Sequence, residues 1–192
     1  MITIGILIFD QVEELDFVGP FEVLSYVNKI QPNSTKVLLL AESSAVVQAF
    51  NGMRILPDTT INSCPQLDVL IVPGGKGRLG AMKNAIITEF IQKQTSTAQY
   101  IASVCTGAFL LAEAGLLTGR KATTYHTAFP ELEAYSVQVL PSKVVQDGNL
   151  ITAGGVSSGL ELGFYLLREL FNAPLSQQVA DKIEYNVDVN NL

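Results

Sequence analysis

Residues 101–111 read IASVCTGAFLL, in which a single cysteine separates an apolar run from a run rich in alanine and leucine. The first run predicts a buried strand and the second predicts a helix. Cys105 therefore lies at the turn from strand to helix. A nucleophile at such a turn needs small neighbours, because the chain folds back closely on both sides, and Ser103 and Gly107 meet that need.

The same alternation of apolar runs and helical periods extends along the chain. We expect strands at residues 2–9, 36–41, 67–72 and 99–104. We expect helices at residues 17–29, 80–95 and 106–114 and near 174–184. A further helix is expected to start near Ser157, with Ser157 or Ser158 as its capping residue. Apolar strands that alternate with helices indicate an α/β fold, with a parallel sheet between helical layers.

Two short segments are predicted to form hairpins instead. Residues 46–56 turn at Asn51-Gly52, and residues 142–152 turn at Asp147-Gly148. Both pairs suit the positive φ angles of a type I′ turn. We expect these hairpins to extend the edges of the sheet.

Length and composition limit the classes of function. The 192 residues fit a single domain, 1–192, with 48% hydrophobic and 16% charged residues. The net charge of −6 and the scattered basic residues argue against nucleic acid as a partner. The run at 3–9 is too short to span a membrane and has no basic leader, so we expect a cytoplasmic protein without a membrane partner.

The cysteine and histidine content excludes the usual metal and disulfide patterns. Cys64 and Cys105 are 41 residues apart, and the chain has one histidine, His126. These spacings match no familiar zinc site and no disulfide framework, and we expect no metal and no cofactor. Cys64 has no activating neighbour and is interpreted as a packing residue.

The active site of an α/β sheet lies at the carboxyl ends of its strands. Cys105 is in that position, and the helix after it is expected to favour the thiolate and lower the pKa of the thiol. The backbone N–H of Thr106 would face an oxyanion formed there. Gly75, which follows the strand at 67–72, is a candidate for the second oxyanion donor, although a loop glycine pair is an equally simple interpretation.

Four of the carboxylates after the first expected strand are candidates for the site. They are Glu13, Glu14, Asp16 and Glu22. Only one or two of them can face the site. Asp16 precedes the expected helix and could simply cap it, and Glu22 could be a solvated side chain.

Three motifs in this order, IVPGG at 71–75, SVCTGAFLLAEAGLLTGRKATT at 103–124 and DGNLITAGGVSSGLELGFYLL at 147–167, resemble the ThiJ/PfpI superfamily over nearly the whole chain. The resemblance implies the class I glutamine-amidotransferase-like, flavodoxin-like fold with a nucleophile elbow, and usually a homodimer. It is strongest for the branch that contains isonitrile hydratases and the amino-terminal domains of AraC-type regulators. By position it assigns Cys105 as the nucleophile, Asp16 as its acid, and Thr106 and Gly75 as their neighbours.

This sequence departs from the family pattern at the histidine. Relatives often have TTH after the elbow helix, whereas here Tyr125 holds the histidine position and His126 follows one residue later. Neighbours on an extended segment point to opposite faces, so His126 could face away from the sulfur. A pair of Cys105 with Asp16 is therefore preferred to a pair of Cys105 with His126.

These residues point to a cofactor-free lyase or hydratase of a small electrophilic substrate, with isonitrile hydration to an N-substituted formamide as the specific hypothesis. Cys105 would attack the terminal carbon, and Asp16, with a raised pKa, would protonate that carbon and then help a water attack. The alternatives are a glyoxalase-like or deglycase-like activity on α-oxoaldehydes, and a non-catalytic redox sensor or ligand-binding module. A transcriptional regulator is disfavoured, because we find no DNA-binding segment in this sequence.

Overall fold

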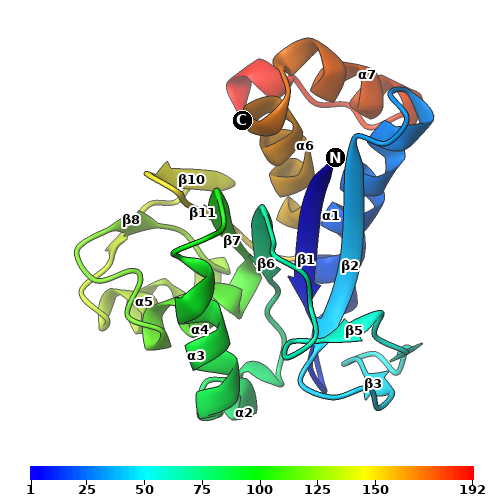
Figure 1. Cartoon of the computed structure of the whole chain (residues 1–192). Coiled ribbons are helices and arrows are strands. Elements are labelled where there is room, and N and C mark those ends of the chain that lie inside the picture. Colours follow the sequence, from blue (N-terminus) through cyan, green and yellow to red (C-terminus); the bar gives the residue numbers. More distant parts are fainter.

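The computed structural model describes residues 1–192 and contains one large sheet of seven strands (Figure 1). In spatial order the strands are β10 (Val144–Asp147), β11 (Leu150–Ala153), β7 (Tyr100–Val104), β6 (Val69–Val72), β1 (Ile2–Leu7), β2 (Thr35–Ala41) and β5 (Thr59–Thr60). All neighbours pair in parallel except β10 with β11. The predicted α/β class with a mainly parallel sheet is confirmed.

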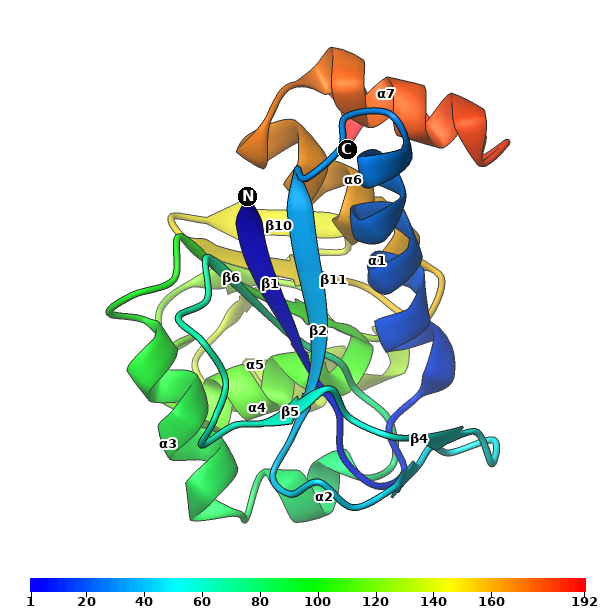
Figure 2. The same ribbon diagram turned by 45° about the vertical axis from the view of Figure 1, so that its right-hand side comes forward.

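Helices cover both faces of this sheet. They are α1 (Glu14–Tyr26), α2 (Arg78–Ala81), α3 (Ala85–Gln94), α4 (Ala108–Glu113), α5 (Phe129–Glu133), α6 (Ser158–Leu170) and α7 (Ala173–Lys182), with 3₁₀ turns η1 (Val27–Lys29), η2 (Cys105–Gly107), η3 (His126–Ala128) and η4 (Val189–Asn191). Figure 2 shows α1 and α6 on one side of the sheet and α3 on the other. No helix is both long and apolar enough to cross a bilayer.

Several helix boundaries differ from the expectation. The first helix begins at Glu14, so Asp16 lies inside its first turn and does not cap it. The expected helix at 80–95 is interrupted, because the side chain of Asn84 caps α3 by accepting a 3.0 Å hydrogen bond from the N–H of Ile86. Ser157 stands at the N-cap of α6 with a helical backbone, and its side chain makes no capping hydrogen bond. The predicted serine cap is wrong, since capping needs an extended backbone at that residue.

Both predicted hairpins exist, but neither turn is type I′. A type I′ turn needs positive φ at both central residues, and only Gly52 (φ 102°) and Gly148 (φ 64°) have it. The first hairpin, β3 (Val47–Gln48) with β4 (Arg54–Ile55), is a separate two-stranded sheet and does not extend the main one. The second, β10 with β11, forms an edge of the main sheet as expected.

Short elements went unpredicted. They are β5, α5 and the small parallel sheet of β8 (Lys121–Ala122) with β9 (Gln138–Val139). A strand of two residues has no periodic pattern, so its position depends on tertiary contacts alone.

The site region follows from the order of the central strands. Strands β7, β6 and β1 are neighbours and run in parallel, so the segments that follow them leave the same edge of the sheet. All side chains of β6 are buried, and they belong to a single apolar cluster that continues under the helices. This rigid base carries the segments 105–107, 73–77 and 8–13.

Candidate active site

Cys105 has the backbone conformation of a nucleophile elbow. It follows β7 directly and has φ of 55°, in the left-handed region that non-glycine residues rarely adopt. Two hydrogen bonds hold it there: its N–H donates to the carbonyl oxygen of Gly154 at 2.8 Å, and the hydroxyl of Thr124 donates to its carbonyl oxygen at 2.7 Å. The strain at Cys105 is thus maintained by two segments distant in sequence.

The small neighbours of the elbow are required by close packing. A Cβ atom on Gly107 would lie 2.0 Å from the carbonyl oxygen of Val72, at the end of β6. Ser103 is completely buried in β7. No larger residue fits at 107 unless the elbow moves away from β6.

The sulfur of Cys105 is mostly enclosed, since the residue is 6% exposed. The backbone N–H groups of Val156 and Thr106 and the hydroxyl of Thr106 face the sulfur, and their hydrogen bonds favour its charged form. A thiolate formed here would therefore be stabilised by two amides and one hydroxyl.

Asp16 is completely buried beside this thiol. Its Oδ2 accepts a 2.9 Å hydrogen bond from the N–H of Gly74, and its Oδ1 has no hydrogen-bond partner. Burial, with a smaller contribution from the charge of Glu13, raises the pKa of Asp16 to about 7, against the opposing interactions with Gly74 and the Cys105 thiol. A buried carboxylate with one unpartnered oxygen and this pKa is ready to accept a proton near neutrality.

The expectation of a lowered thiol pKa is wrong for Cys105. Burial and then the negative charge of Asp16 raise its pKa to about 11, and the hydrogen bonds from Val156 and Thr106 offset only part of this. The helix after the cysteine begins as a 3₁₀ turn and continues as α4, which has only six residues, so the dipole that faces the sulfur is that of a short helix. The resting site therefore holds a thiol, and neutralisation of Asp16 or transfer of the thiol proton to it favours the thiolate.

Gly75 and Thr106 are joined directly. The N–H of Gly75 donates to Thr106 Oγ1 at 3.1 Å, so this amide already has an acceptor. Gly75 has φ of 115°, and a Cβ there would lie 2.4 Å from the backbone nitrogen of Glu13. Only glycine lets the loop after β6 pack so closely on the loop after β1.

Cys105 opens to a pocket of about 350 Å³. Its lining residues are Glu13, Gly75, Lys76, Arg78, Cys105, Thr106, Tyr125 and Val156. His126 is exposed and lines a different pocket with Ser142 and Lys143, whereas Tyr125 lines the cysteine pocket. The structure thus brings Cys105, Asp16, Thr106, Gly75 and Tyr125 together and turns His126 away.

Comparison with known proteins places this geometry in a family. The model of the DJ-1/PfpI family matches residues 3–169. The chain belongs to the DJ-1/PfpI family. This confirms the resemblance to ThiJ/PfpI proteins on which the residue assignments were made.

Individual proteins are similar to this DJ-1/PfpI chain over most of its length. The chain is 39% identical over 187 residues to an isonitrile hydratase of Pseudomonas putida, covering 96% of this chain and 78% of the hydratase. It is 25% identical over 186 residues to the HTH-type transcriptional regulator GbdR of Pseudomonas aeruginosa, covering 95% of this chain and 50% of the regulator. The crystal structure of a ThiJ/PfpI family protein from Pseudomonas syringae superposes with a TM-score of 0.89 at 32% identity, covering 97% of this chain and 76% of that one.

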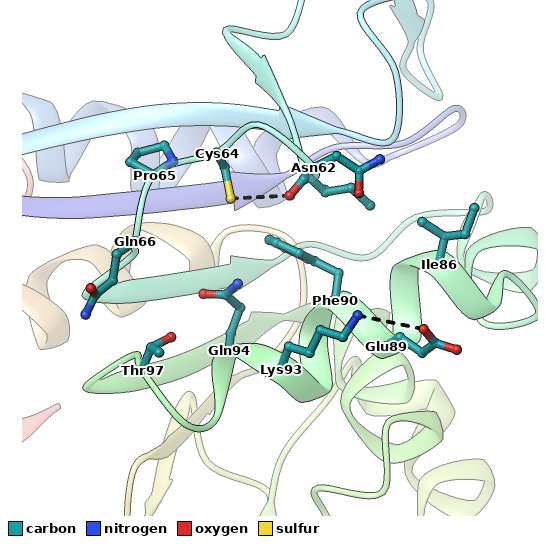
Figure 3. A pocket seen from close by; sticks show the side chains of 11 residues that line it. Asn62, Cys64, Pro65, Gln66, Ile86, Glu89, Phe90, Lys93, Gln94 and Thr97 are labelled. Carbon is teal, nitrogen blue, oxygen red and sulfur yellow. Dashed lines mark hydrogen bonds and ion pairs between the residues drawn. The ribbon is translucent and has the colours of Figure 1, made fainter.

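The second cysteine of this DJ-1/PfpI chain lies in a separate and larger pocket of about 610 Å³, between residues 61–66 and α3 (Figure 3). The thiol of Cys64 donates to the carbonyl oxygen of Ile61 at 3.5 Å, and burial raises its pKa. The backbone φ of Cys64 is not positive, and the hydrogen bond of its thiol goes to a backbone carbonyl and not to a carboxylate. No group of three or more His, Cys, Asp or Glu side chains is arranged to hold a metal ion.

Sequence reasoning missed several residues of the site. Val156 supplies an amide to the sulfur, Gly74 anchors Asp16, and Thr124 holds the elbow. Arg78 also lines the pocket; its guanidinium donates to both oxygens of Glu131 at 2.8 and 3.0 Å and lies over the ring of Phe109. The sequence signal for the loop at Val156 was the pair Gly154-Gly155, which lies in the motif at 147–167 and permits a close approach of the backbone.

Proposed function

We propose that this protein is a cysteine-dependent hydratase that adds water to the terminal carbon of an isonitrile and releases an N-substituted formamide. The observation that carries the proposal is the carboxylate of Asp16, completely buried beside the strained thiol of Cys105 and interacting with it. A carboxylate in that position can take the proton of the thiol as the sulfur attacks. The likeness to the Pseudomonas putida isonitrile hydratase supports the choice of substrate.

The first half of the proposed reaction needs one proton and no cofactor. The sulfur of Cys105 bonds to the terminal carbon of the isonitrile while its proton moves to Asp16. Asp16 then gives that proton to the same carbon, which leaves a thioimidate, R–N=CH–S, on Cys105. A pKa of about 7 suits Asp16 to accept and donate a proton in turn.

The second half releases the product. Water adds to the thioimidate carbon, the nitrogen gains a proton, and the C–S bond breaks to give R–NH–CHO. The departing sulfur is stabilised by the amides of Val156 and Thr106. The pocket of about 350 Å³, walled by Tyr125 and Val156, suits a small substrate.

The test is to incubate the protein with an alkyl isocyanide and follow formamide by proton NMR. We expect turnover by the wild type and by Cys64→Ala, in which the remote thiol is removed, and none by Cys105→Ala. Formamide turnover by Asp16→Asn should be at least about 100-fold slower than that of the wild type, because a positioned acid or base typically contributes this much. Undiminished turnover by Cys105→Ala, or no formamide from the wild type, would reject the proposal.

A second candidate, a cysteine redox sensor, is favoured by one observation. Two amides and a hydroxyl already face the sulfur of Cys105, and the same donors would stabilise the oxygens of a sulfinate. Peroxide treatment followed by peptide mass spectrometry distinguishes the two functions. A sensor would gain two oxygens on Cys105 at low peroxide and would form no formamide.

Lactate formed from methylglyoxal would instead favour the α-oxoaldehyde activity.

We also propose that the protein is a homodimer, with residues 1–192 acting as one domain. Leu15 and Val18 on α1 are each 36% exposed, and Phe50 and Met53 on the β3–β4 hairpin are each 47% exposed. Glu14 ties these two elements together by accepting hydrogen bonds from the backbone of residues 51 and 53. Light scattering of the wild type against Phe50→Glu tests this, since a charge in the buried interface should give monomers.

The redox state of the two cysteines is evidence for the cellular compartment of the protein. Both cysteines are free, and no disulfide joins them. Free thiols are typical of a reducing compartment, so we propose that the protein works in the cytoplasm. Fractionation of cells that express the tagged protein tests this location.

A further inference from the structure

The buried acid of the site has no access to water from the pocket. Asp16 is 0% exposed and does not line the pocket into which Cys105 opens. Its Oδ2 accepts a hydrogen bond from the N–H of Gly74, and its Oδ1 is completely buried. Asp16 is well placed for proton transfer at the sulfur and its bound carbon. It is poorly placed to hold a water molecule that arrives from the open side.

A second carboxylate lies on that open side. Glu13 lines the cysteine pocket and is partly exposed. Its backbone is fixed, because its N–H donates to the carbonyl oxygen of Gly74 at 3.0 Å. Glu13 is three residues before Asp16, at the N-cap of α1, and its charge acts on Asp16. The two carboxylates therefore flank Cys105, one sealed and one open.

The Glu13 side chain is uncommitted. It makes no capping hydrogen bond, and its one polar contact is a long 3.4 Å approach from Asn51 Nδ2. The neighbouring Glu14 is different, since it accepts hydrogen bonds from Asn51 and from the N–H of Met53 and does not line the pocket. Among the carboxylates that follow β1, Glu13 alone combines access to the pocket with free acceptor oxygens.

We propose that Glu13 is a further catalytic residue, the base that activates the attacking water in the second half-reaction. This inference rests on the proposed hydration and assigns its second step. Glu13 takes one proton of the water while the water oxygen bonds to the thioimidate carbon. It then returns that proton to the nitrogen, which becomes an amine. As the C–S bond breaks, the remaining hydroxyl proton passes to Asp16 and the sulfur leaves as a thiolate.

In this scheme Asp16 carries protons in both half-reactions, and Glu13 carries the proton of the attacking water in the second half-reaction alone. The buried Asp16 handles the proton at the sulfur side of the carbon, and Glu13 handles the proton on the solvent side. Two carboxylates held in different environments are a common way to separate acid and base roles within one site. The second step alone uses Glu13 as a proton carrier, and its charge makes a smaller contribution than burial to the pKa of Asp16, so its loss should change the first step little.

The experiment compares Glu13→Gln with the wild type, using an alkyl isocyanide as the probe and intact-protein mass spectrometry as one readout. We expect the thioimidate, one substrate mass on Cys105, to form at the wild-type rate and then accumulate. Formamide turnover should fall roughly 100-fold, within the range for a lost general base. The covalent adduct also reports a folded site. Glu22→Gln, the same change at an exposed position further along α1, should behave like the wild type.

Two results would overturn the role of Glu13 while leaving the hydratase standing. One is wild-type turnover by Glu13→Gln without an accumulated adduct. The other is an equal fall in adduct formation and turnover, which would place Glu13 before the water attack. Absence of both adduct and formamide in the wild type would instead overturn the proposed hydration, and the role of Glu13 with it. Recovery of turnover in Glu13→Asp would support the carboxylate as the acting group.

Discussion

The hydroxyl of Thr124 donates a 2.7 Å hydrogen bond to the carbonyl oxygen of Cys105, 19 residues earlier in the chain. This bond holds the residue with the unfavourable φ of 55°. Thr124→Val keeps the shape and removes the donor, so we expect it to cost about 1–3 kcal/mol of unfolding free energy, the penalty for an unpaired buried polar group. Formamide turnover should also fall by about tenfold or more as the sulfur moves. Urea unfolding and NMR kinetics measure the two effects.

The adjacent Thr123 provides the matched control. It is also buried, but its Oγ1 has no hydrogen-bond partner. Thr123→Val therefore replaces an unpaired hydroxyl by a methyl group, and we expect unchanged or increased stability and full activity. Equal losses in the two variants would show that the hydrogen bond to Cys105 does not hold the elbow.

Gly107→Ala should disrupt the elbow by direct overlap. Its Cβ would lie 2.0 Å from the carbonyl oxygen of Val72 and 2.8 Å from the carbonyl carbon of Pro73, both backbone atoms of a central strand end. Neither atom can move without displacing β6, so we expect loss of activity and a marked fall in melting temperature. Gly80→Ala is the control, because a Cβ there meets nothing within 4 Å and alanine favours the short helix α2 by about 1 kcal/mol. A Gly107→Ala variant as stable as Gly80→Ala would contradict the close approach.

The sequence was sufficient for those parts of the fold that depend on local pattern. Buried strands such as β6 and β7 are continuous apolar runs, and their bounds fell within three residues of the expected ones. Boundaries failed where one side chain or a tertiary contact decides them. Asn84 interrupts the helix at 80–95 by capping α3, and α1 begins at Glu14, three residues before the expected start, with the buried Asp16 in its first turn.

The site was predictable as far as the order of strand ends allows. Cys105, Asp16, Gly75 and Thr106 follow strands that become neighbours, and their proximity follows from the parallel sheet. The sign of the shift in the thiol pKa was not predictable, because it depends on the depth of burial and on the charge of Asp16. The contribution of Val156 required the loop after β11 to fold over the sulfur, which no local pattern encodes.

The raised pKa of Asp16 makes stability depend on pH. A carboxyl group with a pKa of 3.8 when unfolded and about 7 when folded binds more protons in the folded state between those values. Its contribution to stability is therefore complete below about pH 4 and is lost as the pH rises through 7. Roughly three pKa units correspond to about 4 kcal/mol. Urea unfolding from pH 4 to pH 8 should show this fall in the wild type.

Asp16→Asn isolates that contribution. Asparagine can still accept the hydrogen bond from the N–H of Gly74 through its Oδ1, but it does not titrate. All other titrating groups are shared by the two proteins, so the difference between their unfolding free energies should shift in favour of the variant as the pH rises from 4 to 8. Parallel curves over this range would show that Asp16 has an ordinary pKa in the folded protein.

Alkylation of Cys105 tests at which pH its thiolate forms. Burial and the charge of Asp16 raise the pKa of the thiol to about 11, so in a Cys64→Ser background iodoacetamide should react slowly at pH 8 and faster as the pH approaches 11. Asp16→Asn removes the negative charge and should move this profile to lower pH. A profile centred below the ordinary thiol value in both proteins would mean that the amides of Val156 and Thr106 outweigh burial. The thiolate would then exist before substrate binds, and Asp16 would have no proton to take from the sulfur during attack.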